Sequence, residues 1–166
     1  MADEHVASVY GKDIPISTKH AIEICNFIRG KSLQQSKKFL EQVIVMKTAV
    51  PFKIYKRNVG HKPGNMAAGR YPTKASRYIL SLLSSLESNA ENKGLDVSSL
   101  YLTEIIPNRA SRPFHFGRKR RIKMKRTHIQ IFAEERKEEK EKEPRKIEPK
   151  TVKQEIKQEK KKEVKK

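Results

Sequence analysis

The residues able to do chemistry are few, and their spacing does not favour catalysis. Cys25 lies five positions after His20 on the apolar side of a helical repeat, which indicates a buried structural thiol rather than a nucleophile. A single cysteine cannot build a cysteine zinc site, and the five histidines lack ligand spacing. The carboxylates before residue 134 are scattered, with no pair suited to acid–base work. We therefore predict no enzyme, no metal and no cofactor.

Gly64 and Gly69 form a G-x-x-x-x-G pattern that superficially suggests a phosphate-binding loop. Arg70 and Tyr71 come next, where a nucleotide site needs a lysine and a metal-binding hydroxyl, and no strong strand precedes the pattern. The glycines instead favour a close approach of backbone to backbone or to RNA. We expect no small-molecule substrate.

The charge balance indicates a polyanionic partner. The 166 residues include 38 Lys and Arg against 19 Asp and Glu, which makes the formal net charge +19. A cation that neutralises a phosphate releases a condensed counterion, so a nucleic acid is the expected partner. Only 36% of the residues are apolar, too few for the whole chain to bury itself in one core. We expect a small body with an arm or tail that needs a partner or stays solvated.

The cations are concentrated in two stretches without acids, one between Glu41 and Glu87 and the other between Glu104 and Glu134. A surface that only confers solubility mixes both signs, so these blocks are stronger evidence for a polyanion than the total charge. The second block contains the aromatic run 114–116, whose rings can stack on unpaired bases. Because no RNA-recognition or helix-turn-helix signature occurs, we expect recognition by shape and phosphate.

The chain carries no membrane or export signal that we can identify. Its uninterrupted apolar runs are only a few residues long, which excludes a transmembrane helix. Asp3 and Glu4 stand near the start without a following apolar segment, so no signal peptide is expected. A lone cysteine forms no internal disulfide. We predict a cytoplasmic protein without a membrane partner.

Apolar periodicity predicts three helices. Ser17 is a typical N-cap for the first, and Ser32 with Gln35 forms a capping box for the second, which Pro51 is expected to end. The third begins near Thr73. The apolar stripes are Ala21, Ile22, Ile24, Cys25 and Ile28 in the first helix, Leu33, Phe39, Leu40, Val43 and Ile44 in the second, and Ala75, Ile79, Leu82, Leu83, Leu86 and Ala90 in the third.

Three segments have the pattern of strands. Residues 6–16 suit an edge strand, and residues 100–106 and 127–132 alternate and can pair antiparallel. Residues 52–71 are predicted to form a basic loop. On the later two strands the inward faces are expected to be Leu100, Leu102 and Ile106, and Ile129 with Ile131.

The link between the last two strands, residues 107–126, is nearly all polar or basic. A structureless loop of about 20 residues is unusual in a compact domain, so we predict a long protruding hairpin over about 100–132. Its few apolar residues cannot hold a shape in water, so it should become rigid only among anions. The composition then changes to Lys and Glu, and residues 134–166 are predicted to be a disordered tail after a body at 1–133.

Several longer segments match one known family. The Ser-Asn-Ala at 88–90 and the Arg-Thr-His-Ile at 126–129 are the most specific. The matching segments are ISTKHAIEICNFIRGKSLQQSKKFL (16–40), VPFK (50–53), GRYPTKASRYILSLLSSLESNAENKGLD (69–96) and RKRRIKMKRTHIQIF (118–132).

Over residues 5–133 the chain resembles the universal large-subunit ribosomal protein L twenty-two family, called L seventeen in eukaryotes. The insert GHKPGNMAAGRYP at 60–72 resembles the archaeal and eukaryotic branch. The resemblance implies an α+β fold in which a small antiparallel sheet packs on three α-helices. It also implies a long hairpin that threads into the large ribosomal subunit and lines the polypeptide exit tunnel.

The partners implied by the resemblance are large-subunit rRNA, neighbouring large-subunit ribosomal proteins and the nascent polypeptide. The hairpin tip, at about 109–122, would face that polypeptide through Arg112, Phe114, His115, Phe116 and Arg118. Together with the two basic blocks, the resemblance suggests these rRNA-binding residues: Lys19, Lys53, Lys56, Arg57, His61, Lys62, Arg70, Lys74, Arg109, Arg112, Arg118, Lys119, Arg120, Arg121, Lys123, Lys125 and Arg126.

The residues leave one alternative open, a free basic nucleic-acid-binding protein outside the ribosome. Loose electrostatic binders dissociate steeply with salt, whereas a ribosomal protein stays with the large subunit in a high-salt gradient.

Overall fold

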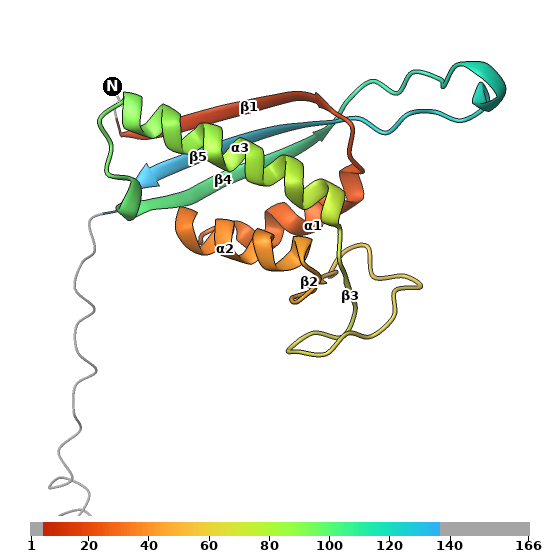
Figure 1. Ribbon diagram of the computed structural model, residues 1–166, viewed down its shortest axis with the longest axis horizontal. Coiled ribbons are helices and arrows are strands. Elements are labelled where there is room, and N and C mark those ends of the chain that lie inside the picture. Colours follow the sequence, from red (N-terminus) through yellow and green to blue (C-terminus); the bar gives the residue numbers. More distant parts are fainter. Residues whose placement is uncertain (1–4, 137–166) are drawn as a thin grey trace, which may run out of the picture. The chain divides into compact units, whose positions relative to one another are not determined.

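The central sheet joins strands from both ends of the described chain. The computed structural model describes residues 5–136, in which β1 (Val6–Ile14), β4 (Leu100–Arg109) and β5 (Thr127–Glu135) form an antiparallel sheet in the order β1-β5-β4. Helix α1 packs against β4 and α3 packs against β1, with α2 against α3 (Figure 1). The predicted α+β class, with three helices and a small antiparallel sheet, is confirmed.

Two short helices follow β1, as their apolar spacing predicts. Helix α1 covers Thr18–Ile28 with Ser17 at its N-cap. Helix α2 covers Leu33–Ile44, and the Ser32 hydroxyl accepts from the backbone N–H of Gln35 at 3.3 Å, which is the expected half of a capping box. The second helix ends at Ile44 rather than at Pro51, because Met46 adopts the left-handed backbone conformation (φ 60°) that terminates a helix.

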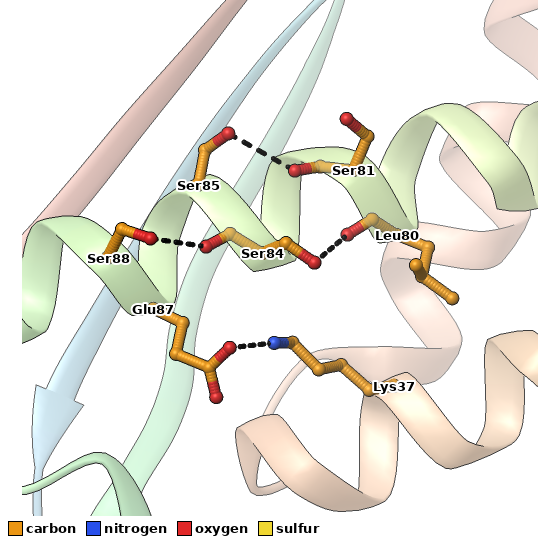
Figure 2. Close-up of polar contacts among 7 residues, drawn as sticks. All are labelled: Lys37, Leu80, Ser81, Ser84, Ser85, Glu87 and Ser88. Atoms are coloured by element: carbon orange, nitrogen blue, oxygen red, sulfur yellow. Dashed lines mark hydrogen bonds and ion pairs between the residues drawn. The ribbon is translucent and has the colours of Figure 1, made fainter.

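Helix α3 (Thr73–Asn92) is the longest element and buries Ile79, Leu83 and Leu86 on its inner side. Its outer side is rich in serine. Figure 2 shows three of these hydroxyls donating to the carbonyl oxygens four residues earlier, which satisfies them within the helix. It also shows the ion pair between Lys37 of α2 and Glu87 of α3. The helix is therefore held mainly by its apolar side, with one polar tie to α2.

The inward face of β4 differs from the sequence prediction. Leu100, Leu102 and Ile105 are fully buried, whereas Ile106 is 37% exposed. The register between β4 and β5 shifts between Leu102 and Glu104. Thr103 is therefore an additional residue in β4, which forms a β-bulge there. Side chains alternate with a period of two, and one inserted residue moves every later side chain to the opposite face. The placement of Ile106 beside Leu100 and Leu102 is therefore wrong.

The segment predicted as a basic loop contains a small second sheet. Strand β2 (Val50–Pro51) pairs antiparallel with β3 (Gly69–Arg70). The backbone N–H of Phe52 also donates to the Ala68 carbonyl at 2.9 Å. The two ends of the loop are thus closed on each other, and most of its residues between them have no regular structure.

Strands β4 and β5 are linked by residues 110–126, which we call the connecting segment. The regular ladder ends at the pair Arg109–Thr127, short of the long hairpin predicted for 100–132. Beyond it, backbone hydrogen bonds join Ala110 to Arg126 at 3.2 Å and His115 to Ile122 at 2.9 Å. The outer part of the segment extends past the sheet (Figure 1).

Strand β5 runs through the first two residues of the predicted tail. Beyond residue 136 the disordered tail predicted for 134–166 lies outside the described residues.

The bulge makes a prediction about neighbouring isoleucines. Ile105→Ala should lower the free energy of unfolding by about 2–5 kcal/mol, because it leaves a cavity in the core. Ile106→Ala should cost clearly less, about 1 kcal/mol, because more than a third of that residue is already exposed. Urea unfolding of both variants measures the difference. Equal losses would contradict the bulged register.

Candidate nucleic-acid interface

The positive charge of the body is largely uncompensated. Within residues 5–136 the structure has a single ion pair, Lys37–Glu87, which joins α2 to α3 and uses no cation of the acid-free blocks. The other cations of this part of the chain have no carboxylate partner, although Arg29, Lys93 and Arg112 donate to backbone carbonyls. A surface of this kind favours a polyanionic partner.

Loop 52–71 is held in place by a carboxylate that the sequence analysis did not single out. Glu23 of α1 is only 2% exposed, and its carboxylate oxygens accept from the backbone N–H groups of Lys53, Ile54 and Tyr55 at 3.0, 2.9 and 2.6 Å. Three amide donors offset the cost of burying the charge. Glu23 thus orients the start of the loop and directs its exposed lysines outward. The sequence signal for this role was an acidic residue placed between the apolar positions Ala21 and Ile24 of the predicted first helix.

Cations from distant segments meet in one cavity of about 400 Å³, which we call the root cavity. It lies where the start of α1, loop 52–71 and the two ends of the connecting segment come together. Tyr55, which Glu23 holds through its amide, faces Lys19 there, with the Lys19 Nζ 5.4 Å from the ring centroid. The root cavity is lined by Ser17, Thr18, Lys19, Tyr55, Arg109, Arg112, Lys125 and Arg126.

A second cavity of about 510 Å³ separates the starts of α1 and α3 from the connecting segment. Its lining includes His20, Lys74, His115, Lys123 and Lys125, together with apolar side chains. The His20 ring meets Phe52 edge-on, with centroids 5.7 Å apart. Burial, and then the charges of Arg70 and Lys125, lower the pKa of His20 below its ordinary value of 6.5.

The outermost cations lie apart from both cavities. Arg118 and Lys119 fall in the single turn η2 (Gly117–Lys119), and Arg120 and Arg121 follow it, all of them exposed. Phe116 is 86% exposed, and Phe114 is 59% exposed with the Lys123 Nζ 4.9 Å from its ring centroid. This end of the segment presents cations and apolar rings to its surroundings together.

The structure divides the seventeen expected binding residues into three groups. Fourteen of these side chains are exposed, and Lys62, Arg112 and Arg126 are half-buried. It separates the five expected tip residues, because Arg112 lines the root cavity and His115 the second cavity. The loop group is Lys53, Lys56, Arg57, His61, Lys62 and Arg70; the cavity group is Lys19, Lys74, Arg109, Arg112, Lys123, Lys125 and Arg126; the outer group is Arg118, Lys119, Arg120 and Arg121.

The remaining candidate chemistry is structural. Cys25 is fully buried, and burial raises the pKa of its thiol to about 12, so the thiol stays protonated. No group of three or more potential metal-ligating His, Cys, Asp or Glu side chains lies together within residues 5–136. In the same part of the chain, no helix combines the length and apolarity required to cross a bilayer.

Known proteins are similar to this chain over most of its length. The family model for ribosomal protein L22p/L17e matches residues 9–134. A "Large ribosomal subunit protein uL22" of Archaeoglobus fulgidus is 42% identical over 137 residues, which cover 78% of this chain and 88% of that protein. Proteins of the same name from Methanosphaera stadtmanae and Methanopyrus kandleri are each 43% identical, over 81% of this chain and 92% and 89% of theirs.

Fold and surface together define the class as a small α+β protein whose many surface cations form only one ion pair within the described residues. The chain belongs to the ribosomal protein L22p/L17e family, in its archaeal-type form. Members of this family are structural ribosomal proteins and not enzymes, which agrees with the absence of catalytic spacing in the sequence.

Glu23 provides a test of how the loop is positioned. Glu23→Ala should lower the free energy of unfolding by about 3 kcal/mol, because three amides lose their acceptor. Glu23→Gln keeps one acceptor oxygen and should cost less. Denaturant unfolding measures both losses, and hydrogen exchange at Lys53 and Tyr55 should accelerate. The matched control Glu91→Ala, on the exposed side of α3, should stay near wild type.

His20 makes stability fall on the acid side. Its folded-state pKa lies below 6.5, so between these two values the unfolded chain binds more protons and stability rises with pH. Thermal unfolding from pH 7.5 down to 5 should show the loss setting in near pH 6.5. In His20→Gln this part of the profile should flatten. An unchanged profile would mean that His20 does not titrate differently in the fold.

Proposed function

We propose that the protein is a structural constituent of the large ribosomal subunit that binds large-subunit rRNA and supports assembly of the subunit. The proposal is carried by one observation: within residues 5–136 the cations of loop 52–71 and of the connecting segment have no carboxylate partner. A cationic surface of this size becomes stable when phosphates neutralise it and counterions are released. The archaeal relatives, each named a large ribosomal subunit protein, support the choice of rRNA.

The distribution of the cations suits folded RNA better than a duplex with a regular groove. They lie on loops and on an extended segment, and none of the three groups forms the row that a groove-reading helix presents. Extended basic segments neutralise phosphates of several RNA strands that pack closely together. The protein would thereby help distant parts of the rRNA to come together during assembly, while neighbouring ribosomal proteins contact its remaining surface.

The outer end of the connecting segment suits the wall of the polypeptide exit tunnel. Exposed Phe114 and Phe116 stand beside Arg118, so this end offers rings for stacking on bases and cations for phosphates. The sides that do not touch RNA would face the nascent polypeptide. The protein would work in cytoplasmic ribosomes.

Sedimentation tests the assignment directly. In a sucrose gradient after a high-salt wash, the protein should stay with the large subunit. Recovery in the free-protein fractions would favour the non-ribosomal alternative, because binding by loose electrostatics is lost steeply as salt rises.

A charge-matched pair of variants tests the contribution of the outer cations. Arg118→Gln with Arg120→Gln should weaken binding to purified large-subunit rRNA and reduce the slope of log K against log salt by about 1.4–1.8, since each lost phosphate contact removes about 0.7–0.9. Lys38→Gln with Lys47→Gln removes the same charge from exposed positions in α2 and in the turn after it, and should change the slope little. Equal effects would mean that only net charge matters.

A further inference from the structure

The root cavity has properties that the outer cations lack. Lys19, Arg109, Arg112, Lys125 and Arg126 converge on a space of about 400 Å³, and no carboxylate lines it. Arginine and lysine side chains can only donate hydrogen bonds, so the cavity is matched to an acceptor-rich ligand. Guanidinium groups suit phosphate oxygens in particular, because their N–H groups pair with two oxygens at once.

The walls of the root cavity are fixed before any ligand arrives. The Thr127 hydroxyl donates to the Ile16 carbonyl at 3.2 Å and lies 3.0 Å from the Thr18 hydroxyl, which joins the start of β5 to the start of α1. The Arg112 Nε donates to the Met124 carbonyl at 3.3 Å, which holds the guanidinium and leaves its other N–H groups free for a ligand. Glu23 fixes the backbone of Tyr55.

Several cations in so small a space repel one another. Arg112 and Arg126 are half-buried, so water screens the repulsion on them less well than at the exposed outer end. An anion that binds there removes the repulsion and makes hydrogen bonds at the same time. The volume is more than ten times the roughly 30 Å³ that a water molecule occupies, which leaves room for more than one phosphate group.

We propose that the root cavity is a built site for two neighbouring backbone phosphates of a tightly turned RNA strand, and that their binding fixes the connecting segment to α1 and loop 52–71. This inference rests on the proposed function, because it takes the phosphates from rRNA. It differs from general charge neutralisation in requiring a saturable site with a definite set of side chains. The phosphates would join three segments that are far apart in the chain.

Inorganic pyrophosphate is the probe, because it holds two phosphate groups together without a sugar or base. Thermal unfolding of the full chain is followed at constant ionic strength, with potassium chloride compensating each addition. The midpoint of thermal unfolding should rise with pyrophosphate concentration and follow the saturation curve of one site, because a ligand that binds the folded state stabilises that state. Amide resonances of Thr18 and Arg126 should shift over the same concentration range.

Variants separate the site from net charge. Arg112→Gln and Lys125→Gln should each weaken pyrophosphate binding about tenfold, the cost of losing a charged hydrogen bond. Lys125→Arg, which keeps the charge, should retain binding. The control Lys38→Gln with Lys47→Gln, which removes more charge away from the cavity, should bind like wild type. Circular dichroism establishes that each variant is folded. The resonance shifts give an affinity even where the substitution itself changes the midpoint of thermal unfolding.

The inference is overturned if pyrophosphate raises the midpoint without saturation, or if the cavity variants and the control respond alike. Neither of these results would change sedimentation with the large subunit, so the proposed function would stand. A second arm uses purified large-subunit rRNA, for which Arg112→Gln should reduce affinity more than the control does. Saturable pyrophosphate binding with equal rRNA affinity in both variants would assign the cavity to a free phosphate compound and overturn the RNA assignment.

Discussion

Repulsion between like charges is the constraint on which the rest of this structure depends. The chain has a formal net charge of +19, and within residues 5–136 one ion pair offsets a small part of it. Such a charge works against a compact state unless the cations are spread out or neutralised from outside. The fold meets this constraint by placing its neutral apolar residues inside the sheet and helices and about half of the cations in residues 5–136 on loop 52–71 and the connecting segment.

Two buried polar side chains, Glu23 and Thr127, connect the apolar core to the charged segments. Glu23 binds three backbone amides at the start of loop 52–71, and Thr127 joins the start of β5 to the start of α1. Both act on the backbone and not on the cations themselves. The positions of the cations are thus set by hydrogen bonds that do not compete with phosphate, which leaves the charged groups free for a ligand.

The helices were predictable from the sequence because their signals are local. The first helix begins after Ser17 and the third at Thr73, as apolar spacing and caps indicated. The strand faces were predicted less well, since the bulge that buries Ile105 in place of Ile106 depends on pairing with a distant strand. The pairing of β2 with β3 was missed for the same reason, because each strand has two residues and no pattern of its own.

For the candidate site, the sequence by itself determined the family and predicted a polyanionic partner, because net charge, acid-free blocks and motifs are properties of the chain in any conformation. The outer group of cations was visible in this way, as a run near residue 120. Only the tertiary structure brought Lys19 beside Arg109 and Arg126, and only it gave Glu23 its role. These residues lie far apart in the chain, and their meeting is decided by sheet register and helix packing, which no local pattern of residues encodes.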